Sequence, residues 1–406
     1  MKQAMPIPWR GILLVGALFS GSVLRADGVL AGSAAVLPFT NLSAASTSGA
    51  PSSDWIGESI AESLREALTA RGVMATPRDD VLEAYGSLRL RVGAELTHAS
   101  VLKLGQTLGV EKVVHGTFRL EASGALTMEA SISDRLRSRV GGRLPESGTL
   151  VDIDRAEAHL AWQVIRVIAP AAAPSESSAQ ILRPQVRAAA EESFIRGWMA
   201  KSPDVKERLY QQAARVDARF ARPALELGKI DLNRRNYKAA SLWFAKVEPS
   251  DLHYPEASFY SGVAKFHDGD YVSAQGAFDR ITKSLPTAEV FNNLGVSENR
   301  LNLSRAISSF RRAIDMDPRN PDYQFNLGYA FFKSGQFDAA ADRFRAVQER
   351  DPADQMATLL LGKSIKHEGI RSGNPADARF EGADRLSETY EAPLPRPAAV
   401  VGVENK

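Results

Sequence analysis

The sequence of 406 residues contains no cysteine. This absence excludes disulfide bonds, thiolate metal sites, cysteine nucleophiles and lipid anchors attached to cysteine. Histidine is scarce as well. No two of the six histidines stand four residues apart, the spacing that places two imidazoles on one face of a helix. We therefore expect neither a metal centre nor a cofactor.

An excess of charge of one sign is also missing. The chain has 50 lysines and arginines against 48 aspartates and glutamates, for a formal net charge of +2. The charge balance therefore gives no indication of binding to nucleic acid or to an anionic membrane surface. The hydrophobic fraction of 44% is typical of a soluble globular protein, and the length suits two or three domains.

Recognisable catalytic motifs are absent too. The chain lacks the phosphate-binding G-x-x-x-x-G-K-[ST], the nucleophile motif G-x-S-x-G and the zinc motif H-E-x-x-H. His115 lies beside Gly116 in a strand pattern, but no nucleophile or base at a recognisable spacing accompanies it. We interpret His115 as a surface histidine and expect that the protein is not an enzyme.

One apolar run, residues 11–19, follows Lys2 and Arg10 near the start of the chain. A helix of this length spans about 14 Å, against about 30 Å of bilayer hydrocarbon. We predict a signal peptide over residues 1–26, cleaved after Ala26 or Ser22; the alternative is a short buried helix. The mature chain is then expected to be periplasmic or secreted, with no transmembrane anchor.

A repeat of 33 or 34 residues occupies the C-terminal half of the chain. Each complete copy has a glycine, an alanine 11 or 12 residues later, and a phenylalanine four residues after the alanine. The last three copies add a proline. The residues are Gly228, Gly262, Gly295 and Gly328, then Ala240, Ala274, Ala306 and Ala340, then Phe244, Phe278, Phe310 and Phe344, then Pro286, Pro318 and Pro352. This pattern resembles the tetratricopeptide repeat, which implies an all-α solenoid of antiparallel helix pairs.

The register of the repeat gives the expected boundaries. We expect the glycine and the alanine to mark the closest approach of the two helices, the phenylalanine to fill the space between successive pairs, and the proline to end the second helix. The predicted units are a degenerate repeat over 187–220, repeats over 221–252, 255–287, 288–320 and 321–354, a capping helix over 355–369 and a flexible tail over 370–406. Within the tail, the segment "FEGADRLSETYEA" is a candidate for a short helix that forms on binding.

The resemblance also implies a concave groove lined by the first helix of each pair. Carried over by position, the groove residues are Asn292, Asn293, Asn299, Arg300, Phe325, Asn326, Tyr329, Phe332, Lys333, Lys363 and Lys366. Asn293 and Asn326 are placed at its edge, where an amide reaches a peptide backbone. Aromatic rings beside amides and cations suit an extended peptide or a helix of a partner protein. The alternative is that these asparagines are common to the repeat whatever it binds, and that the lysines are only solvated.

A different pattern precedes the repeats. Residues 33–39 form a short apolar run, and residues 56–68 have apolar side chains every four residues. Residues 113–120 and 125–133 alternate between apolar and polar side chains around Gly124, as an antiparallel hairpin does. We predict a small α+β domain with its helices on one side of the sheet.

This N-terminal region, residues 31–170, resembles the TolB-like amino-terminal domain in its order of elements and in "AVLPFTNLS" and "LGVEKVVHGTFRLEASGALTMEASISD". The tryptophan-containing strand that usually follows the hairpin in that family is replaced by "GGRLPESGTL". A curli-channel-type domain begins similarly and is the competing fold. A linker rich in proline, alanine and serine over 171–186 joins the domain to the repeats.

Two functional hypotheses follow. The first is an exported scaffold in the bacterial cell envelope, with a peptide or partner protein in the repeat groove and a second protein partner on the N-terminal domain. The second is a small-ligand sensor or enzyme with its site in the N-terminal domain. The missing catalytic motifs favour the scaffold.

Overall fold

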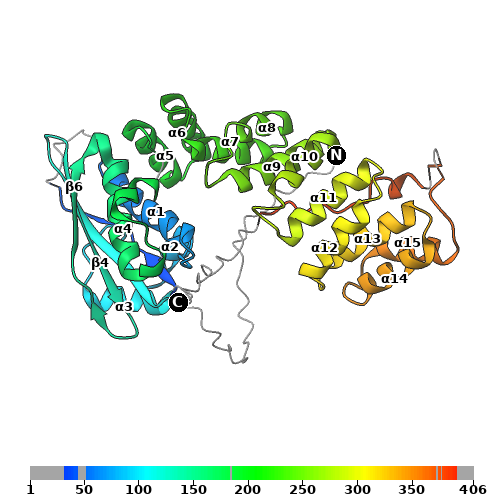
Figure 1. Ribbon diagram of the computed structural model, residues 1–406, viewed down its shortest axis with the longest axis horizontal. Coiled ribbons are helices and arrows are strands. Elements are labelled where there is room, and N and C mark those ends of the chain that lie inside the picture. Colours follow the sequence, from blue (N-terminus) through cyan, green and yellow to red (C-terminus); the bar gives the residue numbers. More distant parts are fainter. Residues whose placement is uncertain (1–31, 44–51, 183–184, 372–373, 376, 391–406) are drawn as a thin grey trace, which may run out of the picture.

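The computed structural model describes residues 32–43, 52–182, 185–371, 374–375 and 377–390. The predicted signal peptide lies outside the described residues. Figure 1 shows a mixed domain of sheet and helices followed by a row of helices that curves from α5 to α15.

The sheet is built around the predicted hairpin, which is confirmed. Lys112 pairs with Asp134 and Leu120 with Leu126, in antiparallel register. The two short strands β1 and β2 run parallel to β3, whereas β5 and β6 run antiparallel to β4. The segment that replaces the tryptophan-containing strand therefore forms a strand, β6. The strands are β1 (Ala34–Val36), β2 (Thr40–Asn41), β3 (Lys112–Leu120), β4 (Ala125–Asp134), β5 (Arg139–Val140) and β6 (Leu144–Thr149).

Helices cover both faces of this sheet, and the expectation of helices on one side only is wrong. Ala34 and Val36 of β1 share a core with α1 and α4, whereas Ala35 and Leu37 pack with α2 and α3. The continuous apolar run of β1 is typical of a strand that is buried on both faces. The helices are α1 (Trp55–Ala70), α2 (Arg78–Ser87), α3 (His98–Thr107) and α4 (Ile153–Ile168), the last preceded by the short helix η1 (Leu150–Asp152).

His115, on β3, is half-buried, and its Nε2 lies 3.1 Å from Ser133 Oγ on β4. Burial, together with nearby His98, lowers the pKa of His115. As the pH falls, the unfolded chain therefore binds this proton at about pH 6.5, whereas the folded chain binds it only at a lower pH. We expect stability to fall as the pH drops from about 7 towards 5, and His115→Gln to reduce that loss. Urea midpoints at both pH values measure it, with the exposed His367→Gln as the control; an identical pH dependence in His115→Gln would contradict the prediction.

The segment predicted as a linker packs against the N-terminal domain where the structure describes it. It forms the short helices η2 (Pro170–Ala172) and η3 (Glu176–Leu182), both of which contact α4. Trp162 of α4 donates a hydrogen bond from Nε1 to the carbonyl oxygen of Pro174 at 3.0 Å.

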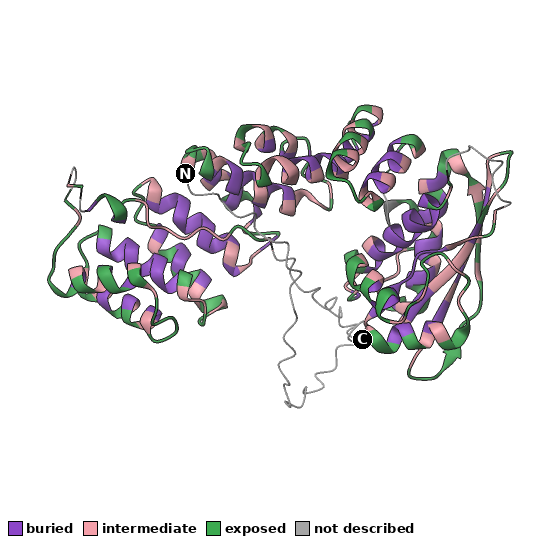
Figure 2. Ribbon diagram, turned by 180° about the vertical axis from the view of Figure 1, so that it is seen from behind, coloured by how far each residue is buried: buried purple, intermediate pink, exposed green. Residues whose placement is uncertain are grey.

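The rest of the chain that the structure describes consists mainly of helix pairs, each of which has buried residues (purple in Figure 2). Their bounds are α5 (Ala188–Met199), α6 (Pro203–Val216), α7 (Ala221–Asn233), α8 (Tyr237–Phe244), α9 (Tyr254–His267), α10 (Tyr271–Ile281), α11 (Ala288–Arg300), α12 (Ala306–Met316), α13 (Pro321–Lys333), α14 (Phe337–Gln348) and α15 (Gln355–Ile365).

Each repeat glycine makes room for the phenylalanine of its own helix pair. A Cβ added at Gly262 would lie 2.6 Å from the Phe278 ring, and one at Gly295 would lie 2.7 Å from the Phe310 ring. Such distances are too short for real carbon atoms. The glycine is therefore a packing residue, as predicted. The phenylalanine, however, fills the space inside its own pair rather than only the space between successive pairs.

The structure differs from the expectation of a flexible tail at residues 377–390, whereas residues 391–406 lie outside the described residues. Residues 377–390 lie along the inner side of the repeats and hydrogen-bond to them over their length. Beyond the short helix η4 (Ala378–Phe380) the segment is not helical. Its backbone groups bond to side chains of the repeats, and these bonds take the place of the helical bonds that the sequence suggested.

The candidate peptide-binding groove

The C-terminal segment, residues 377–390, runs backwards along the first helices of successive pairs. It begins beside Lys363 of α15, passes Tyr329 of α13 and Asn293 of α11, and ends beside Tyr260 of α9. Figure 1 shows it in red, returning from beyond α15 towards the middle of the helix row. An extended segment of the same chain therefore lies along the surface where the groove was predicted.

Asparagine side chains hold the backbone of this segment. Asn326 accepts a hydrogen bond from the Arg385 backbone N–H and donates one to the Arg385 carbonyl oxygen, both at 2.8 Å. Asn293, one repeat earlier, makes the same pair of bonds to Ser387, also at 2.8 Å. Residues that are two apart on an extended strand are separated by about 6.6 Å, and their backbone N–H and C=O groups face the same side. The two amides therefore act as a neighbouring β-strand would.

Asn292 joins these two amides. Its carbonyl oxygen accepts a hydrogen bond from Asn326 at 2.7 Å, and its amide nitrogen donates to the Arg385 carbonyl oxygen at 3.0 Å. Asn292, Asn293 and Asn326 have no exposed surface when the segment is in place. Because a buried amide without a partner is costly, the groove requires a polypeptide or ordered water over these three residues.

A polar pocket receives Asp384 of the segment. Arg300 Nε lies 2.8 Å from the carboxylate, and the Asn299 amide donates to it. The Asp384 side chain is 1% exposed. Burial raises the pKa of Asp384, and the Asn299 hydrogen bond and the charges of Arg300 and Lys333 oppose that rise. Burial lowers the pKa of Lys333, which donates to the Asn299 carbonyl oxygen at 2.7 Å.

The neighbouring Arg385 binds on the opposite side of the groove. Its guanidinium lies 3.6 Å from the centre of the Phe325 ring, where a cation–π interaction is favourable. The same group reaches Asp322 at 2.7 Å and Asp354 at 2.5 Å. The groove thus offers cations to Asp384 and carboxylates to Arg385.

Most of the predicted groove residues meet the segment, and two do not. The structure brings Asn292, Asn293, Asn299, Arg300, Phe325, Asn326, Tyr329, Lys333 and Lys363 to residues 377–387, Lys333 acting by charge on Asp384. Phe332 instead packs against the Phe337 ring in the core, with ring centres 5.7 Å apart. Lys366 is exposed at the end of α15.

The positions carried over from the repeat family did not include the two carboxylates that bind Arg385. They also did not include the residues at the α9 end of the groove. His267 Nε2 lies 2.9 Å from the Glu388 carboxylate, and Phe259 and Tyr260 contact the Tyr390 ring. The histidine holds the pKa of Glu388 below its usual range. The only signal in the sequence for the contacts of Tyr390 is that an aromatic residue stands within the predicted tail.

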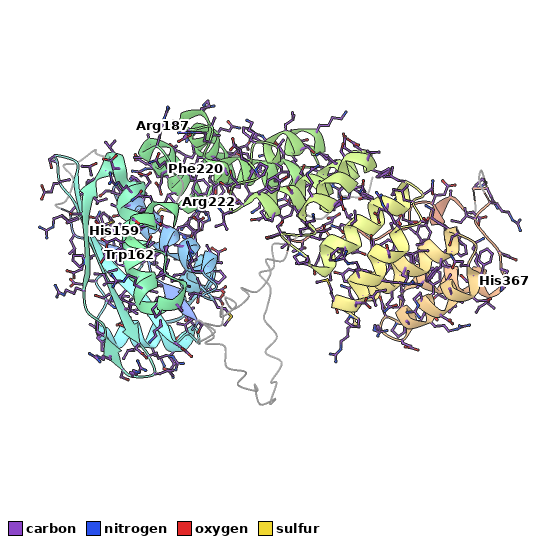
Figure 3. All side chains as sticks on the ribbon, viewed as in Figure 1. His159, Trp162, Arg187, Phe220, Arg222 and His367 are labelled. Atoms are coloured by element: carbon purple, nitrogen blue, oxygen red, sulfur yellow. The ribbon has the colours of Figure 1, made fainter. Side chains whose placement is uncertain are left out.

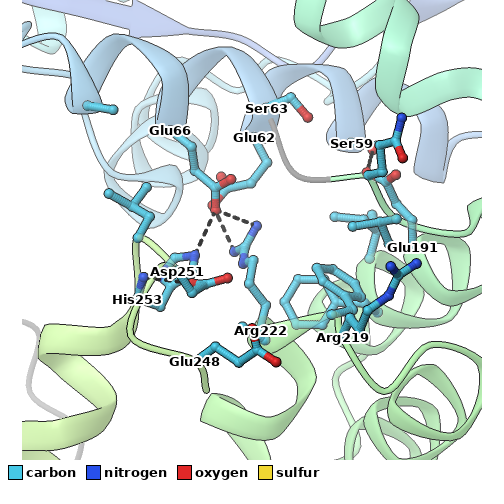
Figure 4. A pocket seen from close by; sticks show the side chains of 18 of the residues that line it. Ser59, Glu62, Ser63, Glu66, Glu191, Arg219, Arg222, Glu248, Asp251 and His253 are labelled. Carbon is cyan, nitrogen blue, oxygen red and sulfur yellow. Dashed lines mark hydrogen bonds and ion pairs between the residues drawn. The ribbon is translucent and has the colours of Figure 1, made fainter. Parts of the chain in front are cut away.

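A second hollow of about 710 Å³ lies between α1 and the start of the repeats. Arg222 stands at this junction (Figure 3). Its two terminal nitrogens lie 2.9 Å from Glu62 and 2.9 Å from Glu66 of α1, and His253 reaches Glu66 at 3.4 Å (Figure 4). These pairs join the N-terminal domain to the repeats. Within the described residues there is no group of three potential metal ligands.

The sequence model of the tetratricopeptide repeat family matches residues 299–355 and 329–385. Within the C-terminal half, residues 299–385 thus match tetratricopeptide repeats. Repeats of this family mediate protein–protein interactions and are in general non-enzymatic. Among the helices that the structure describes, none is long and apolar enough to cross a membrane.

The curated relatives are distant. The CTR9 homolog of Arabidopsis thaliana is 24% identical over 41% of this chain and 15% of its own length. Sperm-associated antigen 1 of Mus musculus is 27% identical over 29% of this chain and 14% of its own length. The chain thus spans less than a quarter of the length of the curated relatives that it matches.

Two similar solved structures each cover less than half of this chain. The crystal structure of YrrB, a TPR protein with an unusual peptide-binding site, has 18% identity and a TM-score of 0.35, covering 42% of this chain and 88% of that one. MamA from Desulfovibrio magneticus RS-1 has 22% identity and a TM-score of 0.37, covering 41% and 95%.

Proposed function

We propose that this protein is a non-enzymatic scaffold whose repeat groove binds an extended segment of a partner protein. The paired bonds from Asn293 and Asn326 to alternate residues of residues 377–390 carry this proposal. Backbone groups are common to every polypeptide, so such bonds supply affinity for an extended chain, and the neighbouring side-chain pockets supply selectivity.

Selection of peptides from a displayed random library tests this function. The bait is the full chain with Arg385→Glu, which sets a carboxylate of the tail against Asp322 and Asp354 and so opens the groove. We expect the recovered peptides to lose at least tenfold in affinity when Asn293→Ala and Asn326→Ala are added, because the backbone bonds are lost. Val272→Ala, at an exposed position of α10, is the matched control. Peptides that bind equally well without the two asparagines would refute the proposal.

The proposal includes export to the bacterial cell envelope. Its support is the pair of charges and the short apolar run at residues 2–19 in the sequence, together with the resemblance of the N-terminal region to the TolB-like domain. Fractionation of expressing cells, followed by sequencing of the N-terminus of the recovered chain, tests it. A chain that starts at Asp27 or Val23 in the envelope fraction agrees with export. A chain that keeps residues 1–26 in the cytosol contradicts it.

A further inference from the structure

The bound tail specifies side chains as well as backbone. Gly382 has φ of +70°, and a Cβ added there would overlap the Arg300 guanidinium, which donates to the Gly382 carbonyl oxygen at 2.7 Å. Tyr329 Oη also accepts from the Gly382 N–H at 3.1 Å and donates to the Phe380 carbonyl oxygen at 2.6 Å. Only glycine adopts this backbone conformation and lets the guanidinium approach the backbone this closely without a cost in free energy.

The two residues of opposite charge fix the register of the segment. Asp384 and Arg385 are adjacent, and the groove offers each of them the opposite charge. A shift by one residue in one direction would set the Asp384 carboxylate against Asp354, and a shift in the other direction would set the Arg385 guanidinium against Arg300; either shift makes a like-charge contact. The groove therefore discriminates between registers by charge, whereas the asparagine bonds alone would accept any register in steps of two residues.

Aromatic side chains close both ends of the contact. Phe380 is 1% exposed, and Lys363 Nζ lies 5.3 Å from the centre of its ring. Tyr390 lies edge-on to Phe259 at 5.8 Å between ring centres. By contrast, Glu381, Glu388 and Thr389 are exposed. The selective positions are thus an aromatic residue, a glycine, an Asp-Arg pair and a second aromatic residue.

We propose that the partner of the groove carries the pattern aromatic-x-Gly-x-Asp-Arg-x₄-aromatic, and that residues 380–390 of this chain are a resident copy which the partner must displace. This inference rests on the proposed function and adds the chemistry of the bound segment to it. A tethered copy competes at an effective concentration in the millimolar range, as short flexible connections give. Partners that lack the pattern are excluded, because they cannot compete with the tail.

The test measures binding of a fluorescein-labelled peptide of residues 378–390 to the full chain by fluorescence anisotropy. We expect the Arg385→Glu chain to bind the peptide at least tenfold more tightly than the unchanged chain, in which the tail occupies the groove. Asp384→Lys, which opposes Arg300, is a second way to release the tail, and thermal melts by circular dichroism show whether each variant is folded. Equal binding by the unchanged and the released chains would overturn the inference.

Changes in the peptide test the pattern itself. On the released chain, Gly382→Ala, Asp384→Asn and Arg385→Ala peptides are expected to bind at least tenfold more weakly, and the exposed Thr389→Ala to bind as the unchanged peptide does. If all four variant peptides bind as tightly as the unchanged peptide, the side chains at these positions do not determine which peptides the groove binds. If library peptides still bind through Asn293 and Asn326 but lack the Asp-Arg pair, this inference fails and the proposed function stands. If no peptide depends on the two asparagines, the proposed function fails as well.

Discussion

Replacing Phe310 by alanine is expected to lower the free energy of unfolding by about 3–5 kcal/mol, the usual cost of removing a buried aromatic ring. The ring has no exposed surface and covers Gly295 of the facing helix, so no other side chain occupies that space. The cavity would lie in the middle of the helix row. The helices of neighbouring repeats pack through α11 and α12, so the loss would weaken the connection between α13–α15 and α9 and α10, which residues 377–390 also bridge.

Urea unfolding followed by circular dichroism measures this effect. Val272→Ala, at a side chain that is 66% exposed, is the control and should change the free energy of unfolding by less than about 0.5 kcal/mol. Gly295→Ala provides a second check, because its added methyl group clashes with the ring. Gly295→Ala should lower the free energy of unfolding by less in a Phe310→Leu background than in the unchanged chain. A loss below about 1 kcal/mol for Phe310→Ala would contradict the packing described here.

The helix pairs were predictable because their packing is local. A glycine and the phenylalanine that covers it stand 15 or 16 residues apart, and the same contact recurs in each repeat, so its spacing is visible in the sequence. The occupant of the groove was not predictable in this way. Asn326 meets Arg385 across 59 residues and Asn293 meets Ser387 across 94, so these contacts have no fixed spacing in the sequence.

The carboxylates that bind Arg385 show a second limit of the sequence. Asp354 is the N-cap of α15 and accepts a hydrogen bond from the Ala357 N–H at 2.9 Å. An aspartate before a helix is common for this reason alone. Its second oxygen is free to bind the guanidinium, and nothing in the local sequence reveals that use. The helices on the second sheet face, however, were within reach of sequence reasoning, since the apolar run at 34–37 already indicates a strand buried on both sides.

Replacing Arg222 by alanine is expected to loosen the junction between the N-terminal domain and the repeats. The change removes one ion-pair partner each from Glu62 and Glu66, and it removes the cation 4.6 Å from the centre of the Phe194 ring. Breaking a buried ion pair costs about 3–5 kcal/mol, and we expect about 2–3 here because the hollow beside Arg222 admits water. Hydrogen exchange at the α1 amides should accelerate, since α1 would lose two ion pairs to the repeats.

The controls separate charge from shape at this junction. Arg222→Lys keeps the charge but cannot bridge both glutamates in the same way, so we expect a loss between those of the unchanged chain and Arg222→Ala. Arg219→Ala, at a side chain that is 80% exposed on the same hollow, should leave exchange at α1 unchanged. If Arg219→Ala and Arg222→Ala accelerate exchange equally, the total positive charge around the hollow, and not the two ion pairs of Arg222, holds the N-terminal domain to the repeats. If only Arg222→Ala does so, the two ion pairs to α1 fix the orientation in which the N-terminal domain presents the groove to a partner.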